Sequence, residues 1–118
     1  MARLTRLSIV LATWCPHCVP LSLENTKRMA EDLGVPFRVL DIEGEDTGKL
    51  ADEMVREHGD NVEDYLVPQV FAEFEDESVK HFFTGFSEST EVTKRNWENL
   101  FKSRFYSELK NGRASHFS

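Results

Sequence analysis

The sequence has few cysteines, glycines and prolines and no long run of apolar residues. Only two of its 118 residues are cysteines, six are glycines and four are prolines. A secreted domain held by disulfides would carry more cysteines, spread along the chain, and a collagen-like or low-complexity chain would be far richer in glycine and proline. The longest uninterrupted apolar run, Ile9–Ala12, is much shorter than the roughly 20 residues that cross a membrane. We therefore expect a soluble protein of the cytoplasm without a membrane as partner.

The composition is that of one globular domain with an uneven charge. Hydrophobic residues make up 40% of the chain and charged residues 30%, an ordinary balance for a single core. The net charge is −7, and residues 31–64 alone carry −9. Because nucleic acids and anionic membranes are polyanions, this acidic middle argues against both as partners; its ordinary explanation is a solvated surface. We expect a monomer with one domain at 1–110 and a flexible tail at 111–118.

Four short segments have the pattern of β-strands. Residues 7–12 are an apolar run of the length of a buried strand, and residues 37–42 form a second. Residues 67–74 are a third strand, entered through Pro68, and residues 79–84 alternate as a strand paired antiparallel to it.

Three helices are predicted between and after these strands. The first begins at Pro16, where the missing N–H of proline is tolerated, and ends at Gly34. The second follows an acidic turn and is predicted to place four residues on one face: Leu50, Met54, Val55 and His58. The third is capped by Ser87 or Ser89 and has an apolar face of five residues: Trp97, Leu100, Phe101, Phe105 and Leu109.

The resulting order, β-α-β-α-β-β-α, defines an α/β fold. A β-α-β start implies parallel pairing of the first two strands, and the last two strands pair antiparallel. We therefore expect a central mixed sheet with helices on both faces.

The two cysteines lie in the sequence Cys15-Pro16-His17-Cys18, where a strand leads into a helix. Unpaired N–H groups and the positive end of the helix dipole at such a position favour a thiolate, so Cys15 is the candidate nucleophile. Cys18, one helical turn further on, can resolve the mixed disulfide by attacking Cys15. A protonated His17 would stabilise the thiolate and make the pair a stronger oxidant.

Two other interpretations of the cysteine pair remain. The pair could be half of a zinc site, but His58, His81 and His116 are scattered along the chain and form no second close pair of ligands. It could also be chemically inert, although the proline and histidine at a helix start favour sulfurs near the surface. We expect no metal.

The segment from Trp14 to Cys18, followed some fifty residues later by Val67-Pro68, resembles the thioredoxin superfamily. The resemblance implies a thioredoxin-like fold in which Pro68 is a cis-proline packed beside the disulfide. It also implies that Val67 offers its backbone to an extended substrate. Trp14 is expected to shield the disulfide and line the substrate groove; its alternative role is only to anchor the end of the strand. Pro16 and His17 would tune the active site.

Within this superfamily the sequence is most similar to glutaredoxins. Thr84-Gly85-Phe86-Ser87-Glu88 looks like their later glycine turn, and the resemblance implies that Gly85 and Ser87 contact glutathione. The expected activity is that of a thiol–disulfide oxidoreductase acting on protein or small-molecule disulfides. No cofactor would be tightly bound; glutathione as co-substrate, or a partner like thioredoxin reductase, would supply electrons. The alternative is a non-catalytic module that senses redox state or binds a partner.

Overall fold

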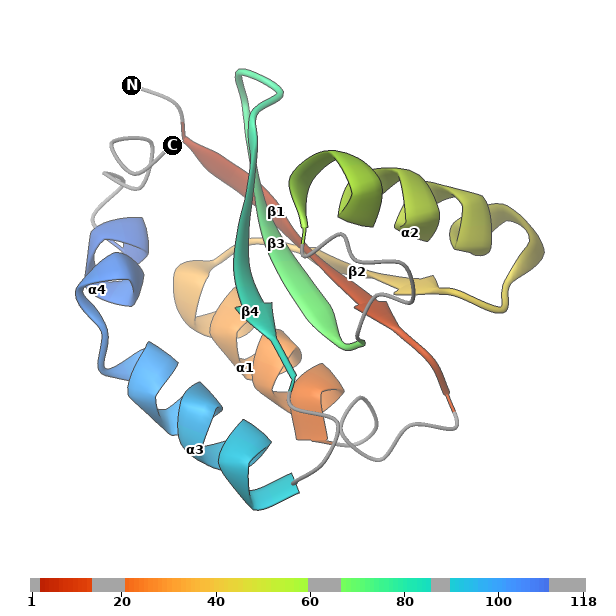
Figure 1. The fold of residues 1–118 in the computed structure, drawn as a ribbon. Coiled ribbons are helices and arrows are strands. Elements are labelled where there is room, and N and C mark those ends of the chain that lie inside the picture. Colours follow the sequence, from red (N-terminus) through yellow and green to blue (C-terminus); the bar gives the residue numbers. More distant parts are fainter. Residues whose placement is uncertain (1–2, 14–20, 60–66, 86–89, 111–118) are drawn as a thin grey trace.

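Four strands form one mixed sheet in the computed structural model, which describes residues 3–13, 21–59, 67–85 and 90–110. The strands are β1 (Leu4–Leu11), β2 (Phe37–Asp41), β3 (Gln69–Phe74) and β4 (Val79–Thr84). Their order across the sheet is β2-β1-β3-β4 (Figure 1). β1 is parallel to β2 and antiparallel to β3, which in turn is antiparallel to β4.

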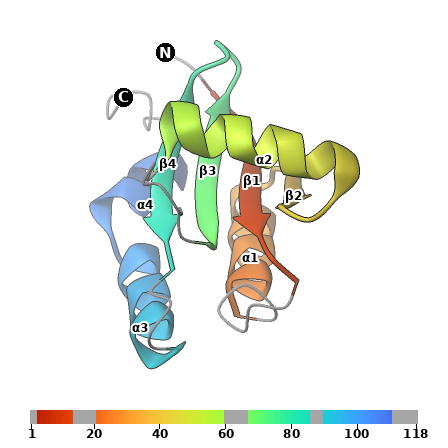
Figure 2. The same ribbon diagram turned by 45° about the vertical axis from the view of Figure 1, so that its right-hand side comes forward.

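Four helices within the described ranges cover the two faces of this sheet. They are α1 (Leu23–Leu33), α2 (Glu45–His58), α3 (Thr90–Phe101) and α4 (Arg104–Lys110). Figures 1 and 2 show α2 on one face and the other three helices on the opposite face. The expected α/β class, the mixed sheet and the helices on both faces are confirmed.

The prediction of a single last helix is wrong, because the chain turns between α3 and α4. The N–H groups of Lys102 and Ser103 bond three residues back, to the carbonyls of Asn99 and Leu100, which tightens and ends α3. The Ser103 hydroxyl then accepts a hydrogen bond from the N–H of Tyr106 at 3.2 Å. A serine in this position caps the start of α4.

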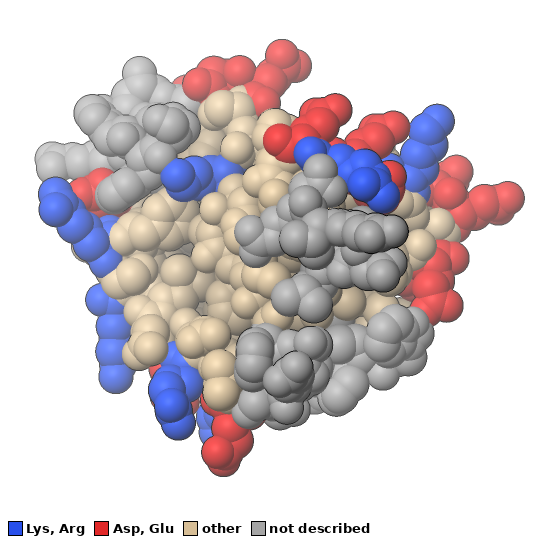
Figure 3. Space-filling view, viewed as in Figure 1, with Lys and Arg blue, Asp and Glu red and all other residues tan. Residues whose placement is uncertain are grey.

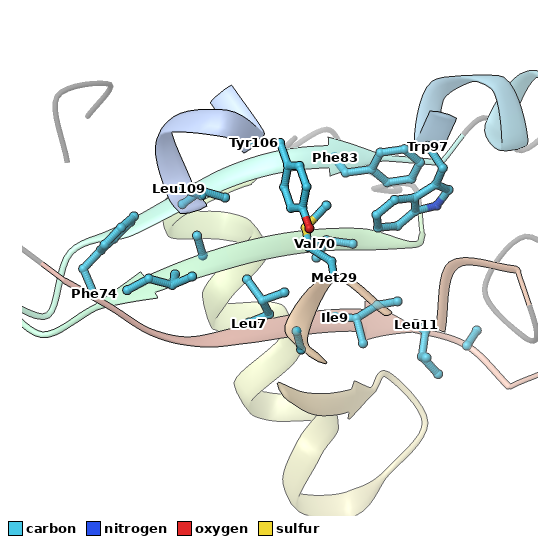
Figure 4. Packing of buried hydrophobic residues seen from close by; sticks show 14 residues of the cluster. Leu7, Ile9, Leu11, Met29, Val70, Phe74, Phe83, Trp97, Tyr106 and Leu109 are labelled. Atoms are coloured by element: carbon cyan, nitrogen blue, oxygen red, sulfur yellow. The ribbon is translucent and has the colours of Figure 1, made fainter. Parts of the chain in front are cut away.

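The larger core lies between the sheet and the three helices α1, α3 and α4. Leu7, Ile9 and Leu11 of β1 are at most 1% exposed and face Met29 of α1 and Trp97 of α3 (Figure 4). Alternate residues of a strand point to one face, so the apolar run of β1 can supply both cores. The expectation that Trp97, Phe101, Phe105 and Leu109 pack in the core is confirmed.

The smaller core lies under α2. Ala51, Met54 and Val55 of α2 pack on Val10 and Phe71 of the sheet. Their spacing of three and four residues defines one stripe of the helix.

Two residues predicted for this stripe are not buried. Leu50 is 44% exposed and His58 is exposed. Leu50 lies at the margin of the stripe, because the small Ala51 rather than Leu50 rests on the sheet.

A polar cluster of four residues extends the α2 face of the sheet beyond the smaller core. Arg6 donates hydrogen bonds to both carboxylate oxygens of Glu73, at 3.1 and 2.8 Å, and Ser8 donates a third. Arg38 donates to the Ser8 hydroxyl at 2.9 Å. Burial alone would raise the pKa of Glu73, but the hydrogen bonds from Arg6 and Ser8 and the charge of Arg38 leave it below the ordinary value.

α4 is fixed to α1 by a second polar contact. The Tyr106 hydroxyl donates a hydrogen bond to Asp32, and Lys110 Nζ lies 3.2 Å from Asp32 Oδ2. Burial and this carboxylate raise the pKa of Tyr106. Within the described ranges, no helix has the length and apolarity needed to span a membrane.

Candidate functional site

The residues predicted to carry the chemistry fall partly outside the described residues. Those outside are Trp14, Cys15, Pro16, His17, Cys18 and Ser87. Val67, Pro68 and Gly85 are described, and they lie together at one end of the sheet. The structure therefore describes the frame of the candidate site, to which the cysteine segment is joined at Thr13.

Three strands bring their ends to this edge of the sheet. Val10 near the end of β1 pairs with Gln69 at the start of β3, and Gln69 pairs with Thr84 at the end of β4. The chain that leaves β1 toward Cys15 thus starts beside the residues that enter β3. The antiparallel register of β1 and β3 is what places them together.

Pro68 lies at this end of the sheet, directly before the inner strand β3. It is buried, and the Val67–Pro68 peptide bond is cis, as the resemblance implies. Val67 is half-buried, and no hydrogen bond joins its backbone to another described residue. The backbone N–H and C=O of a half-buried residue just before a strand are suited to bind an extended chain.

Gly85 is packed directly on Pro68. Its N–H donates a hydrogen bond of 2.8 Å to the Pro68 carbonyl. A Cβ atom on Gly85 would clash with Cδ of Pro68 and lie 2.9 Å from its Cγ. The structure thus gives Gly85 a packing reason to be glycine, separate from the ligand contact that the resemblance implies.

Gln69 is a buried polar residue beside Pro68 that the sequence pattern did not single out. It is fully buried. Gly59, directly after α2, lies so close that a Cβ there would clash with Gln69 Oε1 and lie 2.9 Å from Phe71 Cζ. The end of α2 is therefore held tightly against the start of β3.

The start of α1 is tied to α3 by a hydrogen bond that the sequence pattern also did not reveal. The indole Nε1 of Trp97 donates to the Ser22 hydroxyl at 2.9 Å, and both side chains are buried. Trp97 also stacks on Phe83 of β4, with ring centroids 4.2 Å apart. These contacts link α1, α3 and β4 just after the cysteine segment.

No group of three His, Cys, Asp or Glu side chains that could hold a metal ion occurs in the described part of the chain. Both cysteines lie outside that part, so the zinc alternative is not tested by this observation. One described histidine lies near the candidate site: His81 Nε2 shares a hydrogen bond of 2.6 Å with Oγ1 of Thr84, the residue before Gly85.

Compared with family models, curated proteins and solved structures, the chain matches none of them. The cysteine motif and the geometry at this end of the sheet are therefore the features that point to a function.

Proposed function

We propose that this protein is a thiol–disulfide oxidoreductase of thioredoxin-like fold. The observation that carries the proposal is the register of β1 and β3. This register brings the end of β1, which leads to Cys15, beside the entry to β3, where Val67 can offer an extended substrate a backbone that bonds to no other described residue. The strand order β2-β1-β3-β4, with helices on both faces, supports the same assignment.

The proposed reaction is a two-electron exchange between the cysteine pair and a substrate disulfide. The Cys15 thiolate attacks one sulfur, forming a Cys15–substrate disulfide and breaking the substrate S–S bond; the released thiolate takes a proton from water. The Cys18 thiolate then attacks Sγ of Cys15, which forms the Cys15–Cys18 disulfide and releases the second substrate thiol. The substrate is reduced and the protein pair is oxidised.

A reductant must restore the dithiol after each turnover. Two glutathione molecules, or the dithiol of a partner like thioredoxin reductase, would each supply the two electrons. The proposal thus assigns the protein to a reducing compartment such as the cytoplasm. Ser87 and Gly85 are the residues that the glutaredoxin resemblance would place on glutathione.

Insulin reduction with a dithiol donor tests the proposal. The protein at substoichiometric amounts should accelerate the reaction, and Cys15→Ser should abolish the acceleration. The matched variant Cys18→Ser keeps the nucleophile and should instead accumulate the mixed disulfide. No acceleration by the wild-type protein would favour the sensing or binding alternative, and stoichiometric zinc in the purified protein would favour a metal site.

A further inference from the structure

A groove of about 520 Å³ lies between α1 and α3, on the sheet face opposite α2. Its apolar lining includes Leu21, which precedes α1, and Trp97 and Phe101 of α3. Because Leu21 lies two residues before the first residue of α1, this α1–α3 groove reaches the start of that helix. Its volume is in the range of roughly 300–1,000 Å³ that is usual for ligand sites.

The rim of the α1–α3 groove is positively charged. Arg28, Lys94 and Lys102 line it, against Glu98 as the single acid among the described lining residues. The two lysines each lie one helical turn from Glu98, yet neither forms an ion pair with a described residue. The Arg28 guanidinium carbon lies 4.6 Å from the centroid of the Phe101 ring. The groove thus offers two ammonium groups without an ion pair among the described residues, and a guanidinium that lies over an aromatic ring.

This cationic rim contrasts with the rest of the surface. The chain as a whole carries −7, and residues 91–118 carry +3. In Figure 3, Lys and Arg predominate along the edge made by α3 and α4, with a few Asp and Glu among them, while Asp and Glu gather at the β3–β4 turn and, together with some basic side chains, over α2. The net positive charge of this edge favours an anionic partner there over the acidic middle of the chain.

We infer that the α1–α3 groove binds an acidic segment of a partner protein. Carboxylates of that segment pair with Lys94, Lys102 and Arg28, and one bulky apolar side chain rests on Leu21 and Phe101. The inference rests on the proposed function in one respect: the partner is a protein whose disulfide is exchanged. The chain's own tail, residues 111–118, holds an arginine and no acid and does not complement the rim.

The test uses a fluorescently labelled, cysteine-free peptide of Asp and Glu around one Phe, with anisotropy measured on the reduced full-length protein. The double variant K94Q/K102Q removes two rim charges. The control K27Q/K49Q removes two charges from exposed lysines that do not line the groove. We expect K94Q/K102Q to weaken binding by about fivefold to tenfold and the control by less than about twofold.

Salt gives a second readout. Raising the ionic strength from about 0.01 M to about 0.15 M shortens the Debye length from about 30 Å to about 8 Å, so binding should weaken for the wild type more than for K94Q/K102Q. Four results overturn the inference: no binding of the acidic peptide, equal binding of its Asn/Gln counterpart, equal losses in the two double variants, or equal binding of a DNA oligonucleotide. Self-association that competes with the peptide reassigns the groove to a second copy.

The peptide assay and insulin reduction fail independently. Absent peptide binding with intact insulin reduction overturns the groove assignment alone. Intact peptide binding without insulin reduction overturns the proposed function, and with it the nature of the partner.

Discussion

Gly85 and Pro68 form a close backbone contact at the end of the sheet where the candidate site lies. The Gly85 N–H donates to the Pro68 carbonyl at 2.8 Å, and the proline ring fills the space that a Cβ on Gly85 would need. The end of β4 thereby holds the entry to β3 in place. A side chain at position 85 would disturb the two residues, Val67 and Pro68, that the proposed function assigns to substrate binding.

Gly85→Ala is therefore expected to lower both stability and activity. Overpacking of this kind costs about 1–3 kcal/mol, and insulin reduction should fall further than the folded fraction explains. Gly34→Ala is the control: Gly34 ends α1 at φ 71° with no atom near its Cβ position. It should lose about 1–2 kcal/mol from the left-handed backbone alone and keep its activity. Equal activity losses in both variants would contradict the account.

The Ser22–Trp97 hydrogen bond is expected to stabilise the start of α1. Ser22→Ala leaves the buried indole N–H without its partner and should cost about 1–3 kcal/mol in urea unfolding. Trp97→Phe removes the donor itself. The loss in free energy of unfolding for the double variant S22A/W97F should therefore be smaller than the sum of the losses for the two single variants. Strict additivity would mean that the hydrogen bond contributes nothing.

The polar cluster of Arg6, Ser8, Arg38 and Glu73 predicts that the free energy of unfolding depends on pH in the acid range. Because the folded pKa of Glu73 is below its unfolded value of roughly 4.3, its contribution is fully present above that value and is lost as the pH falls through the folded pKa. Glu73→Gln should lower the free energy of unfolding at pH 7 by about 1–3 kcal/mol.

The difference between the wild type and Glu73→Gln should then shrink between about pH 5 and pH 2. Glu53→Gln, an exposed change on α2, is the matched control for the loss of one surface carboxylate. A difference that stays constant over this range would contradict the role of the Glu73 charge.

Replacing Thr26 is expected to raise stability, unlike the substitutions above. Its hydroxyl is buried in α1 with no hydrogen-bond partner among the described residues, so Thr26→Val should raise stability by about 1 kcal/mol. In the matched change Thr47→Val, the lost hydroxyl donates a 2.8 Å hydrogen bond to the Asp41 carbonyl. That variant should lose about 0.5–1.5 kcal/mol in the same urea experiment. A loss of stability in Thr26→Val would show that its hydroxyl is bonded in solution.

The strands could be predicted from the sequence because local pattern determines them. β4 has the predicted bounds, whereas β1 starts three residues earlier and β3 two residues later than predicted. The break at Ser103 could not be read from the apolar spacing, because Trp97, Phe101 and Phe105 keep a period of four on both sides of it. Leu50 was misplaced because spacing alone does not say which neighbour in a stripe rests on the sheet.

The candidate site could be predicted only where a motif marks it. Cys15 and Pro68 belong to recognisable patterns, and Pro68 has the cis peptide bond and the place before β3 that the resemblance implies. Gln69, Ser22 and the cationic rim depend on contacts between segments far apart in the sequence. Such contacts leave no periodic or motif signal in a single chain.

The most direct test of the proposed chemistry is an equilibrium titration of the full-length protein in glutathione redox buffers, with Cys15 and Cys18 followed by thiol alkylation and mass. The account predicts a reversible two-electron transition with a midpoint between about −120 and −270 mV, the range spanned by dithiol oxidoreductases. If the two cysteines never pair reversibly within the chain, the protein is not a thiol–disulfide oxidoreductase of the kind proposed.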